Sequence, residues 1–277
     1  MLTQIKSIYF IARYICYLPL IFLMMINLSC FQDPISIDLS QFGQNIVIEG
    51  YITDYEGVNA VRISQTAPIS TENIFPAVSD ALVTITDDQN KSVQLIETEP
   101  GLYQNSTLKG VYGRSYTLSV SYEGKTYRAS SVMPQPLYFF SIYFQQIDPS
   151  VDRYELLCYL KDREGIKDYC MIDLYINGTL VAHSLYQDDK SDGEEIIFDD
   201  FDIVFNPGDH VIIDLLTIDK FTYEFFYTLD QISDSDQEDF EDTIMPVTTY
   251  NPTSNWDNSA FGYFSAHAVR RYNRIVE

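Results

Sequence analysis

The chain has 277 residues, of which 40 are acidic and 17 are basic, so its formal net charge is −23 at pH 7. A surface this negative repels phosphate backbones and anionic lipid headgroups, which excludes nucleic-acid binding. Hydrophobic residues make up 46% of the sequence and aromatic residues 14%, which is ample material for a core. The length suits one large domain or two ordinary ones.

The N-terminus has the features of an export signal. Basic residues precede an apolar run over residues 15–28, which is short for a membrane-spanning helix of about 20 residues. The run ends at Ser29-Cys30, and a small residue before a cysteine is what the lipoprotein signal peptidase requires. We therefore expect residues 1–29 to be a lipoprotein signal peptide, Cys30 to be the lipidated N-terminus and residues 30–44 to be a tether. The alternative is an uncleaved anchor with an incidental cysteine, and either reading places the rest of the chain outside the cytoplasm.

Residues 45–133 have the pattern of a β-sandwich. Apolar residues alternate with polar ones over residues 116–122, which predicts a half-buried strand, and Glu123-Gly124 predicts a two-residue hairpin turn after it. Short runs of this kind recur between turns, which favours an immunoglobulin-like sandwich. The prolines of residues 133–136 interrupt the pattern and mark the predicted domain boundary.

A second β-rich domain is predicted over residues 137–277, with strand-like runs at 139–147, 154–160, 169–176, 196–205 and 211–216. Apolar residues at helical spacing predict one helix near residues 219–232, and Asp219 can cap it. These helical positions are Phe221, Phe225, Leu229 and Ile232. The predicted fold class is all-β, with an N-terminal immunoglobulin-like sandwich followed by a β-rich domain that contains one short helix.

Two cysteines beyond the lipidation site, Cys158 and Cys170, flank a turn-like segment over residues 161–168. A hairpin centred near Glu164 would place them opposite each other, which makes them a disulfide candidate in an oxidising compartment. Two free, buried thiols are the open alternative, and the separation of the Cα atoms distinguishes the two.

Catalytic motifs are absent from the sequence. The three histidines form no paired motif, and there is no nucleophile elbow, zinc-binding His-Glu-x-x-His or glycine-rich phosphate loop. The chain is therefore predicted not to be an enzyme and to need no cofactor. Residues 188–199 resemble a calcium loop, but Lys190 occupies a ligand position, which favours a solvated hairpin tip and no metal.

Three further features have two readings each. Asp242-Thr243-Ile244 matches a short acceptor pattern for O-glycosylation, with Thr243 as the candidate residue, although so short a pattern also occurs by chance. The aromatic cluster within residues 138–144 is a sugar platform or, more simply, the core packing of a strand. Trp256 is a packing residue or a contact residue, and packing is favoured.

Several strings of residues, taken in order, resemble one protein family: 76–86, 113–120, 124–129, 207–209, 218–220, 223–229, 251–255 and 261–266. They are similar to the domain-of-unknown-function 4249 family of Bacteroidota outer-membrane lipoproteins. The resemblance implies attachment to outer-membrane lipid through acylated Cys30, on the periplasmic or the surface face. It also implies a TonB-dependent transporter as a partner, because such genes often lie beside one, and it supplies no catalytic residues.

These expectations combine into a functional hypothesis. The chain is expected to be a non-enzymatic accessory subunit of a TonB-dependent transporter, which captures ligand or covers the barrel. The alternative is a structural or adhesive surface lipoprotein that makes protein–protein contacts.

Overall fold

The computed structural model describes residues 45–55, 59–66, 75–147, 150, 152–188, 193–199, 201, 203–235 and 252–277. All of them belong to one compact unit, Gly43–Glu277. The predicted signal peptide and tether lie outside the described residues, as do the candidate sites Cys30 and Thr243. In the described part of the chain, no helix is long and apolar enough to cross a membrane.

The described elements are strands with a single helix, α3 (Lys220–Ser235), which confirms the predicted all-β class. The strands are β1 (Ile46–Thr53), β2 (Asn59–Gln65), β3 (Leu82–Asp87), β4 (Ser92–Glu99), β5 (Leu102–Asn105), β6 (Ser115–Tyr122), β7 (Lys125–Val132), β8 (Phe139–Gln146), β9 (Tyr154–Lys161), β10 (Tyr169–Ile176), β11 (Thr179–Gln187), β12 (Glu195–Phe198), β13 (His210–Thr217) and β14 (Phe261–Ile275).

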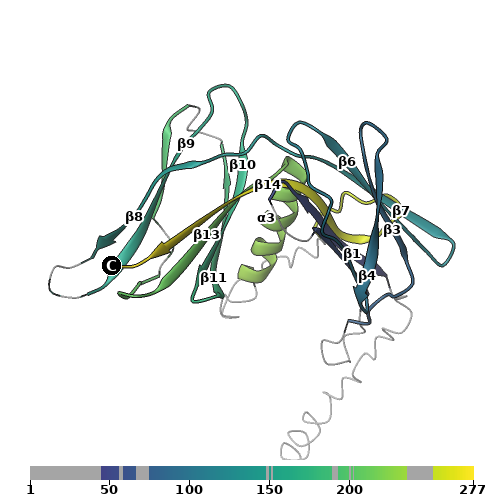
Figure 1. Ribbon diagram of the computed structural model, residues 1–277, viewed down its shortest axis with the longest axis horizontal. Helices are drawn as coiled ribbons and strands as arrows, with labels where there is room; N and C mark the ends of the chain where they lie inside the picture. The colour runs from purple at the N-terminus through teal and green to yellow at the C-terminus, as the bar shows by residue number, and fades with distance from the viewer. Residues whose placement is uncertain are drawn as a thin grey trace, which may run out of the picture. The chain divides into compact units, whose positions relative to one another are not determined.

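The strands form two sheets, and the long strand β14 lies between β13 and β1 in the larger one (Figure 1). The larger sheet has 11 strands in the order β11-β10-β13-β14-β1-β2-β5-β4-β3-β6-β7, and the smaller has the order β12-β9-β8. The first half of β14 runs parallel to β1, with Phe261 opposite Val47 and His267 opposite Thr53. Its second half pairs antiparallel with β13. One continuous strand therefore joins the N-terminal and C-terminal strands of the large sheet.

The first hydrophobic core lies where the N-terminal strands fold over one another in a sandwich-like arrangement. Gly50 on β1 lies so close to Leu118 on β6 that a Cβ on the glycine would be 2.7 Å from the leucine Cδ2. These two strands are not neighbours in the sheet order. They therefore face each other across the core, and the absence of a side chain at this glycine permits the close approach.

Residues near the C-terminus complete this first core, although the sequence places them in the second predicted domain. Trp256, Ala260, Phe264 and Ala266 pack among the residues of β1, β3 and β6. The Trp256 indole donates a hydrogen bond of 3.1 Å to the Ile48 carbonyl, and its ring is buried, as expected of a packing residue. A parallel pair such as β1 and β14 needs a long connection, so no local pattern reveals it.

The second core lies between the β10–β13 part of the large sheet and the three-stranded sheet, and it contains both cysteines. The predicted hairpin is wrong: Cys158 lies on β9, which pairs with β8 and β12, whereas Cys170 lies on β10, which pairs with β11 and β13. Both thiols are free and buried, and no disulfide joins them. The chain crosses between sheets because each strand then buries its apolar face in one shared core.

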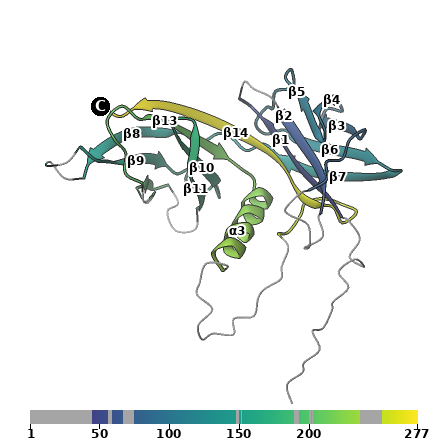
Figure 2. The same ribbon diagram turned by 90° about the horizontal axis from the view of Figure 1, so that it is seen from below.

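The helix α3 begins as predicted but buries a different stripe of residues. Asp219 caps it by accepting a hydrogen bond of 2.8 Å from the Thr222 amide. Tyr223 and Phe225 are buried against the sheet, whereas Phe221 is 55% exposed. Figure 2 shows the helix on one side of the strands β10, β11 and β14, which it contacts. Helical spacing predicted the element correctly, but which stripe faces the sheet depends on how the helix docks.

Candidate ligand-binding pocket

A pocket of about 510 Å³ opens over the central strands of the large sheet, on the face that α3 partly covers. Its lining comes from β1, β10, β11, β13, β14 and α3. Side chains alternate between the two faces of a strand. On β14, for example, Tyr263, Ser265 and His267 line the pocket, while the intervening Phe264 and Ala266 belong to the first core. We call this cavity the central pocket.

Aromatic rings make up much of the wall of the central pocket. Tyr51, Tyr55, Tyr175 and Tyr263 come from the sheet side, and Phe226 comes from α3. The rings of Phe226 and Tyr263 meet edge to face, with centroids 5.0 Å apart. Such pairs hold each other in fixed orientations, so the helix and the sheet together set the shape of the wall.

A row of charged residues crosses four neighbouring strands within the pocket. Strand register places His183 opposite Asp173, Asp173 opposite Asp214, and Asp214 opposite Arg271. His183 Nδ1 lies 2.8 Å from Asp173 Oδ1. The Arg271 guanidinium donates to both oxygens of Asp214, at 2.7 Å and 2.5 Å. The row thus consists of two cation–carboxylate pairs set side by side.

These contacts change the titration of both cations. The hydrogen bond to Asp173 raises the pKa of His183, so this imidazole keeps its proton to higher pH than an isolated histidine does. The hydrogen bonds to Asp214 raise the pKa of Arg271 further above its already high value. The guanidinium also lies over the Tyr55 ring, 5.6 Å from its centroid, in a cation–π contact.

The pKa of a second histidine in the pocket, His267, is shifted in the opposite direction. Burial lowers the pKa of His267 to about 4, so the ring is neutral at neutral pH. Its Nδ1 lies 3.0 Å from Ser265 Oγ. Among the residues that the structure describes, no carboxylate is hydrogen-bonded to His267. The pair therefore lacks the third group that orients the base in a Ser-His-Asp triad, and it serves as polar lining.

The structure also bears on the aromatic cluster and the calcium-like segment that the sequence analysis singled out. Of the aromatic cluster, Phe139 is buried in the second core, while Tyr138 and Phe140 are more than half exposed. Core packing therefore accounts for only part of the cluster. Within the described ranges, no three His, Cys, Asp or Glu side chains are grouped to hold a metal ion. Part of the calcium-like segment, residues 189–192, lies outside those ranges.

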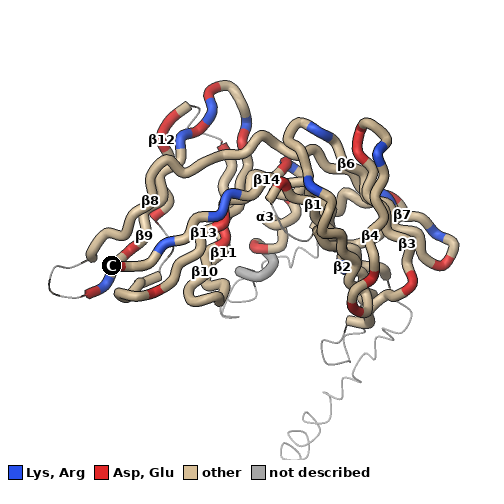
Figure 3. The backbone as a smooth tube through the Cα atoms, in the orientation of Figure 1, with Lys and Arg blue, Asp and Glu red and all other residues tan. Residues whose placement is uncertain are grey.

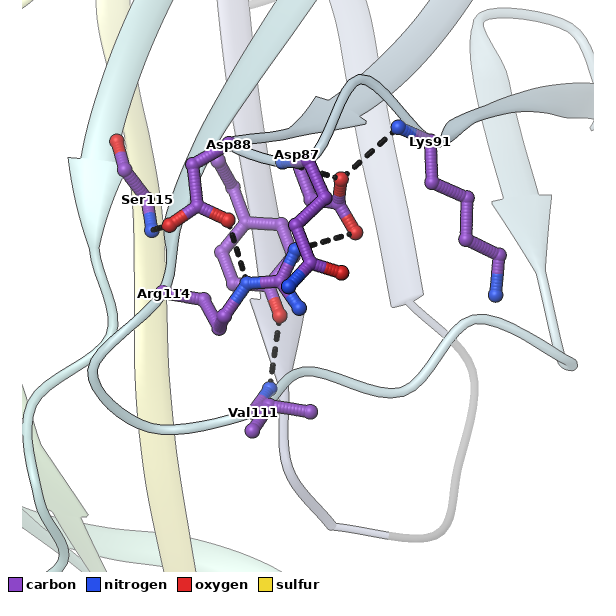
Figure 4. Close-up of polar contacts among 8 residues, drawn as sticks. Asp87, Asp88, Lys91, Val111, Arg114 and Ser115 are labelled. Carbon is purple, nitrogen blue, oxygen red and sulfur yellow. Dashed lines mark hydrogen bonds and ion pairs between the residues drawn. The ribbon is translucent and has the colours of Figure 1, made fainter.

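A separate polar network, shown in Figure 4, fixes the turn between β3 and β4. Arg114 forms ion pairs of 2.9 Å with Asp87 and 2.5 Å with Asp88. A hydrogen bond from the Lys91 amide lowers the pKa of Asp87 and keeps it ionised. Tyr116 Oη accepts a hydrogen bond of 2.8 Å from the Val111 amide. Because each of these groups has a partner within the network, we assign it a structural role.

Sequence reasoning missed the central pocket entirely. The available signal was the polar side chains at alternate positions of otherwise buried strands, such as Asp173 on β10 and Asp214 on β13. Each carboxylate stands among apolar neighbours, which is costly unless the charge is paired. Such a residue points either to a site or to a structural ion pair, and only the register shows that the two carboxylates lie side by side.

Comparison with known proteins gives a family. A comparison with curated proteins found no match. The family model described as Domain of unknown function (DUF4249) matches residues 32–273. The matched region contains all the described residues that line the central pocket. It also contains the buried residues of the first and second cores, except Val276 of the second core. The chain belongs to the DUF4249 family.

Proposed function

We propose that this protein is a non-enzymatic outer-membrane lipoprotein, anchored through acylated Cys30, that captures a ligand in the central pocket for a TonB-dependent transporter. The observation that carries the proposal is the pocket itself. Its volume of about 510 Å³ falls within the range of roughly 300–1,000 Å³ that is usual for small-molecule sites. Aromatic walls with a few fixed polar groups are also the usual composition of such sites.

The anchor and the partner are supported by the sequence. The N-terminal segment has a basic front, a short apolar run and a small residue before Cys30. The resemblance to Bacteroidota lipoproteins adds the transporter, because genes of that kind often lie beside one. A lipid tether would keep the pocket at the membrane at a high effective concentration, so that even a weak contact with the barrel would persist.

A structural or adhesive role is the second candidate, and an exposed aromatic patch favours it. On the three-stranded sheet, Phe140 is 58% exposed, Tyr143 is 43% exposed and Ile197 is 47% exposed. Tyr143 stacks on Tyr159, with ring centroids 5.5 Å apart. Exposed apolar patches of this kind often mark protein contact surfaces. We call this set of four residues the aromatic patch.

Two experiments test the proposal. A Cys30→Ala variant should leave the membrane fraction, and if it stays bound as tightly as the wild type, the lipidation claim is wrong. A copy tagged after the exposed Glu277 is then recovered in mild detergent and its partners are identified by mass spectrometry. Recovery of a TonB-dependent barrel in near-equal amount supports the accessory role.

Matched variants separate the two candidate functions. Phe140→Ser alters the aromatic patch, and Tyr263→Leu alters the central pocket. If the protein is recovered alone while the barrel is present in the input, a stable complex with the transporter is contradicted. If Phe140→Ser also removes some other protein partner that Tyr263→Leu retains, the structural or adhesive role is favoured.

A further inference from the structure

We propose that the central pocket selects an organic cation, whose ammonium group lies among the tyrosine rings next to Asp173. This inference rests on the proposed ligand capture and adds the chemical class of the ligand. Three observations support it: the position of Asp173, the aromatic wall around it, and the way in which the pocket already holds its own cations.

Asp173 occupies the middle of the charged row and borders the open volume of the pocket. Its cross-strand neighbours are His183 and Asp214, and its side chain is 17% exposed. His183 engages Oδ1, and in the described part of the chain Oδ2 has no hydrogen-bond partner. A carboxylate oxygen without a partner in a pocket is an acceptor for a ligand ammonium group.

The charge of Asp173 affects the pKa values of residues on more than one strand. Burial raises the pKa of Tyr175 on the same strand and of Tyr263 on β14, and the charge of Asp173 adds to both shifts. This charge also opposes the lowering of the pKa of His267 that burial causes. The negative potential of this carboxylate therefore extends across the pocket, where it would attract a cation and repel an anion.

The aromatic wall provides the complementary attraction. A cation placed over the face of a tyrosine or phenylalanine ring, within about 6 Å of its centroid, is attracted by the negative face of the ring. Tyr51, Tyr175, Tyr263 and Phe226 all line the same cavity as Asp173. The pocket already contains one such contact, because Arg271 lies over Tyr55.

An anionic ligand would have to compete for a cation that already has a carboxylate partner. Among the described residues that line the pocket, Arg271 is the one arginine, and its guanidinium donates to both oxygens of Asp214. Taking a ligand carboxylate would break this bidentate pair and leave Asp214, which is 5% exposed, without its cation. The net charge of −23 also disfavours an anionic ligand, and it acts over a longer range.

The resident competitor of a cationic ligand is His183. When it is protonated, this imidazole neutralises the charge of Asp173 from the β11 side. The α3 helix also faces His183: the Phe226 ring centroid lies 5.8 Å from that of the imidazole, and the charge of Asp230 acts on the pKa of the histidine. Asp214 lies one strand beyond Asp173. Deprotonation of His183 frees the charge of Asp173, so affinity for a cation should rise as pH increases through the pKa of His183.

The test uses the full chain in detergent and three probes of the same shape and different charge. Choline carries a positive charge, 3,3-dimethylbutan-1-ol is its neutral isostere, and 3,3-dimethylbutanoate is a negatively charged analogue. Binding is followed by ligand-observed NMR titration. We expect choline to bind about tenfold more tightly than the neutral alcohol, and we expect the difference to grow as pH rises. Equal or tighter binding of the alcohol or the carboxylate overturns the proposal, and so does the absence of choline binding at millimolar concentration.

Two variants test whether the preference for choline depends on Asp173. Asp173→Asn removes the charge at nearly constant shape and should abolish the preference for choline. Glu99→Gln removes one negative charge at an exposed position of β4, outside the pocket, and should leave the preference unchanged. A similar loss in both variants would assign the effect to net charge and overturn the proposal.

The wild-type probe series decides whether the pocket prefers a cation even if Asp173→Asn fails to fold. Tight binding of the neutral or negative probe would refute the ligand class alone, because membrane recovery and the barrel pull-down test the capture role independently.

Discussion

Arg271 on β14 and Asp214 on β13 are register partners, and the guanidinium contacts both carboxylate oxygens within the central pocket. The contact does two things at once. It neutralises a carboxylate that is 5% exposed, and it ties the second half of β14 to the strand beside it. Because the first half of β14 pairs with β1, this ion pair lies close to where the two groups of strands join.

Arg271→Met should therefore destabilise the fold by about 1–2 kcal/mol, since it leaves the Asp214 carboxylate without its cation. The loss is smaller than for a fully buried pair because the Arg271 side chain is 39% exposed and solvent screens its charge. The free energy of unfolding is measured by urea titration. Lys220→Met is the control, because it breaks the exposed pair between Lys220 and Glu224, and we expect a loss of about 0.5 kcal/mol or less. Similar losses in the two variants would show that the Arg271–Asp214 pair contributes no more than a surface pair.

Gly262→Ala should disrupt the junction between β14 and β1. Gly262 has a φ of 92°, and an added Cβ would lie 2.2 Å from the Ile48 carbonyl oxygen. Either β14 must shift or the residue must change conformation, so we expect a loss above about 3 kcal/mol in unfolding free energy. Gly124→Ala is the control, because Gly124 also has a positive φ but no atom within 4 Å of the new Cβ. A loss at Gly262 no larger than that at Gly124 would contradict the close approach.

The thiols of Cys158 and Cys170 should resist alkylation in the folded protein. Burial raises the pKa of Cys158 to about 12 and also raises that of Cys170, so neither forms the reactive thiolate near neutral pH. Mass spectrometry after iodoacetamide treatment should find both residues unmodified in the native protein and both modified in denaturant. A mass two hydrogens lower, with no labelling in denaturant, would instead indicate a disulfide.

His267 should make stability depend on pH. Its pKa is about 4 in the folded state, compared with 6.5 for the exposed side chain. Below pH 6.5 the unfolded chain binds a proton that the folded protein refuses, so the free energy of unfolding should fall as pH decreases from about 6.5 to about 4. His183 acts in a different pH range: because its pKa is raised above 6.5, the stability that it contributes is present below about pH 6.5 and is lost as pH rises through its folded-state pKa.

Comparing variants isolates the contribution of His267. His267→Gln should flatten the dependence of stability on pH between about 4 and 6.5. His183→Gln should leave that range unchanged and should instead remove the fall in stability that the wild type shows as pH rises above about 6.5. Both are read from urea titrations at a series of pH values. An unchanged pH profile in His267→Gln would show that this ring is not held neutral by its burial.

Local patterns in the sequence predicted the local parts of the fold. The alternation along β6 and the turn at Glu123-Gly124 correspond to the observed β6–β7 hairpin. The cap at Asp219 and the helical spacing after it correspond to α3. In these cases the residues that interact lie only a few positions apart, so the relevant physics can be read from a short window.

Features that depend on distant residues escaped prediction. The hairpin predicted at Glu164 was wrong because the strands on either side of it pair with other partners in different sheets. The pairing of β1 with β14 joins opposite ends of the chain. Strand register brings Asp173 and Asp214 side by side in the central pocket. The two residues lie far apart in the sequence, and no local pattern indicates that they are neighbours. The candidate role of the pocket could therefore be assigned only after the sheet order was known.

Native mass spectrometry of the protein isolated from its own membrane shows whether the central pocket captures a ligand. We expect a bound small molecule on the wild type and on Phe140→Ser, and its loss from Tyr263→Leu. A molecule retained equally by Tyr263→Leu, or lost only from Phe140→Ser, would contradict the claim and place the binding activity outside the central pocket.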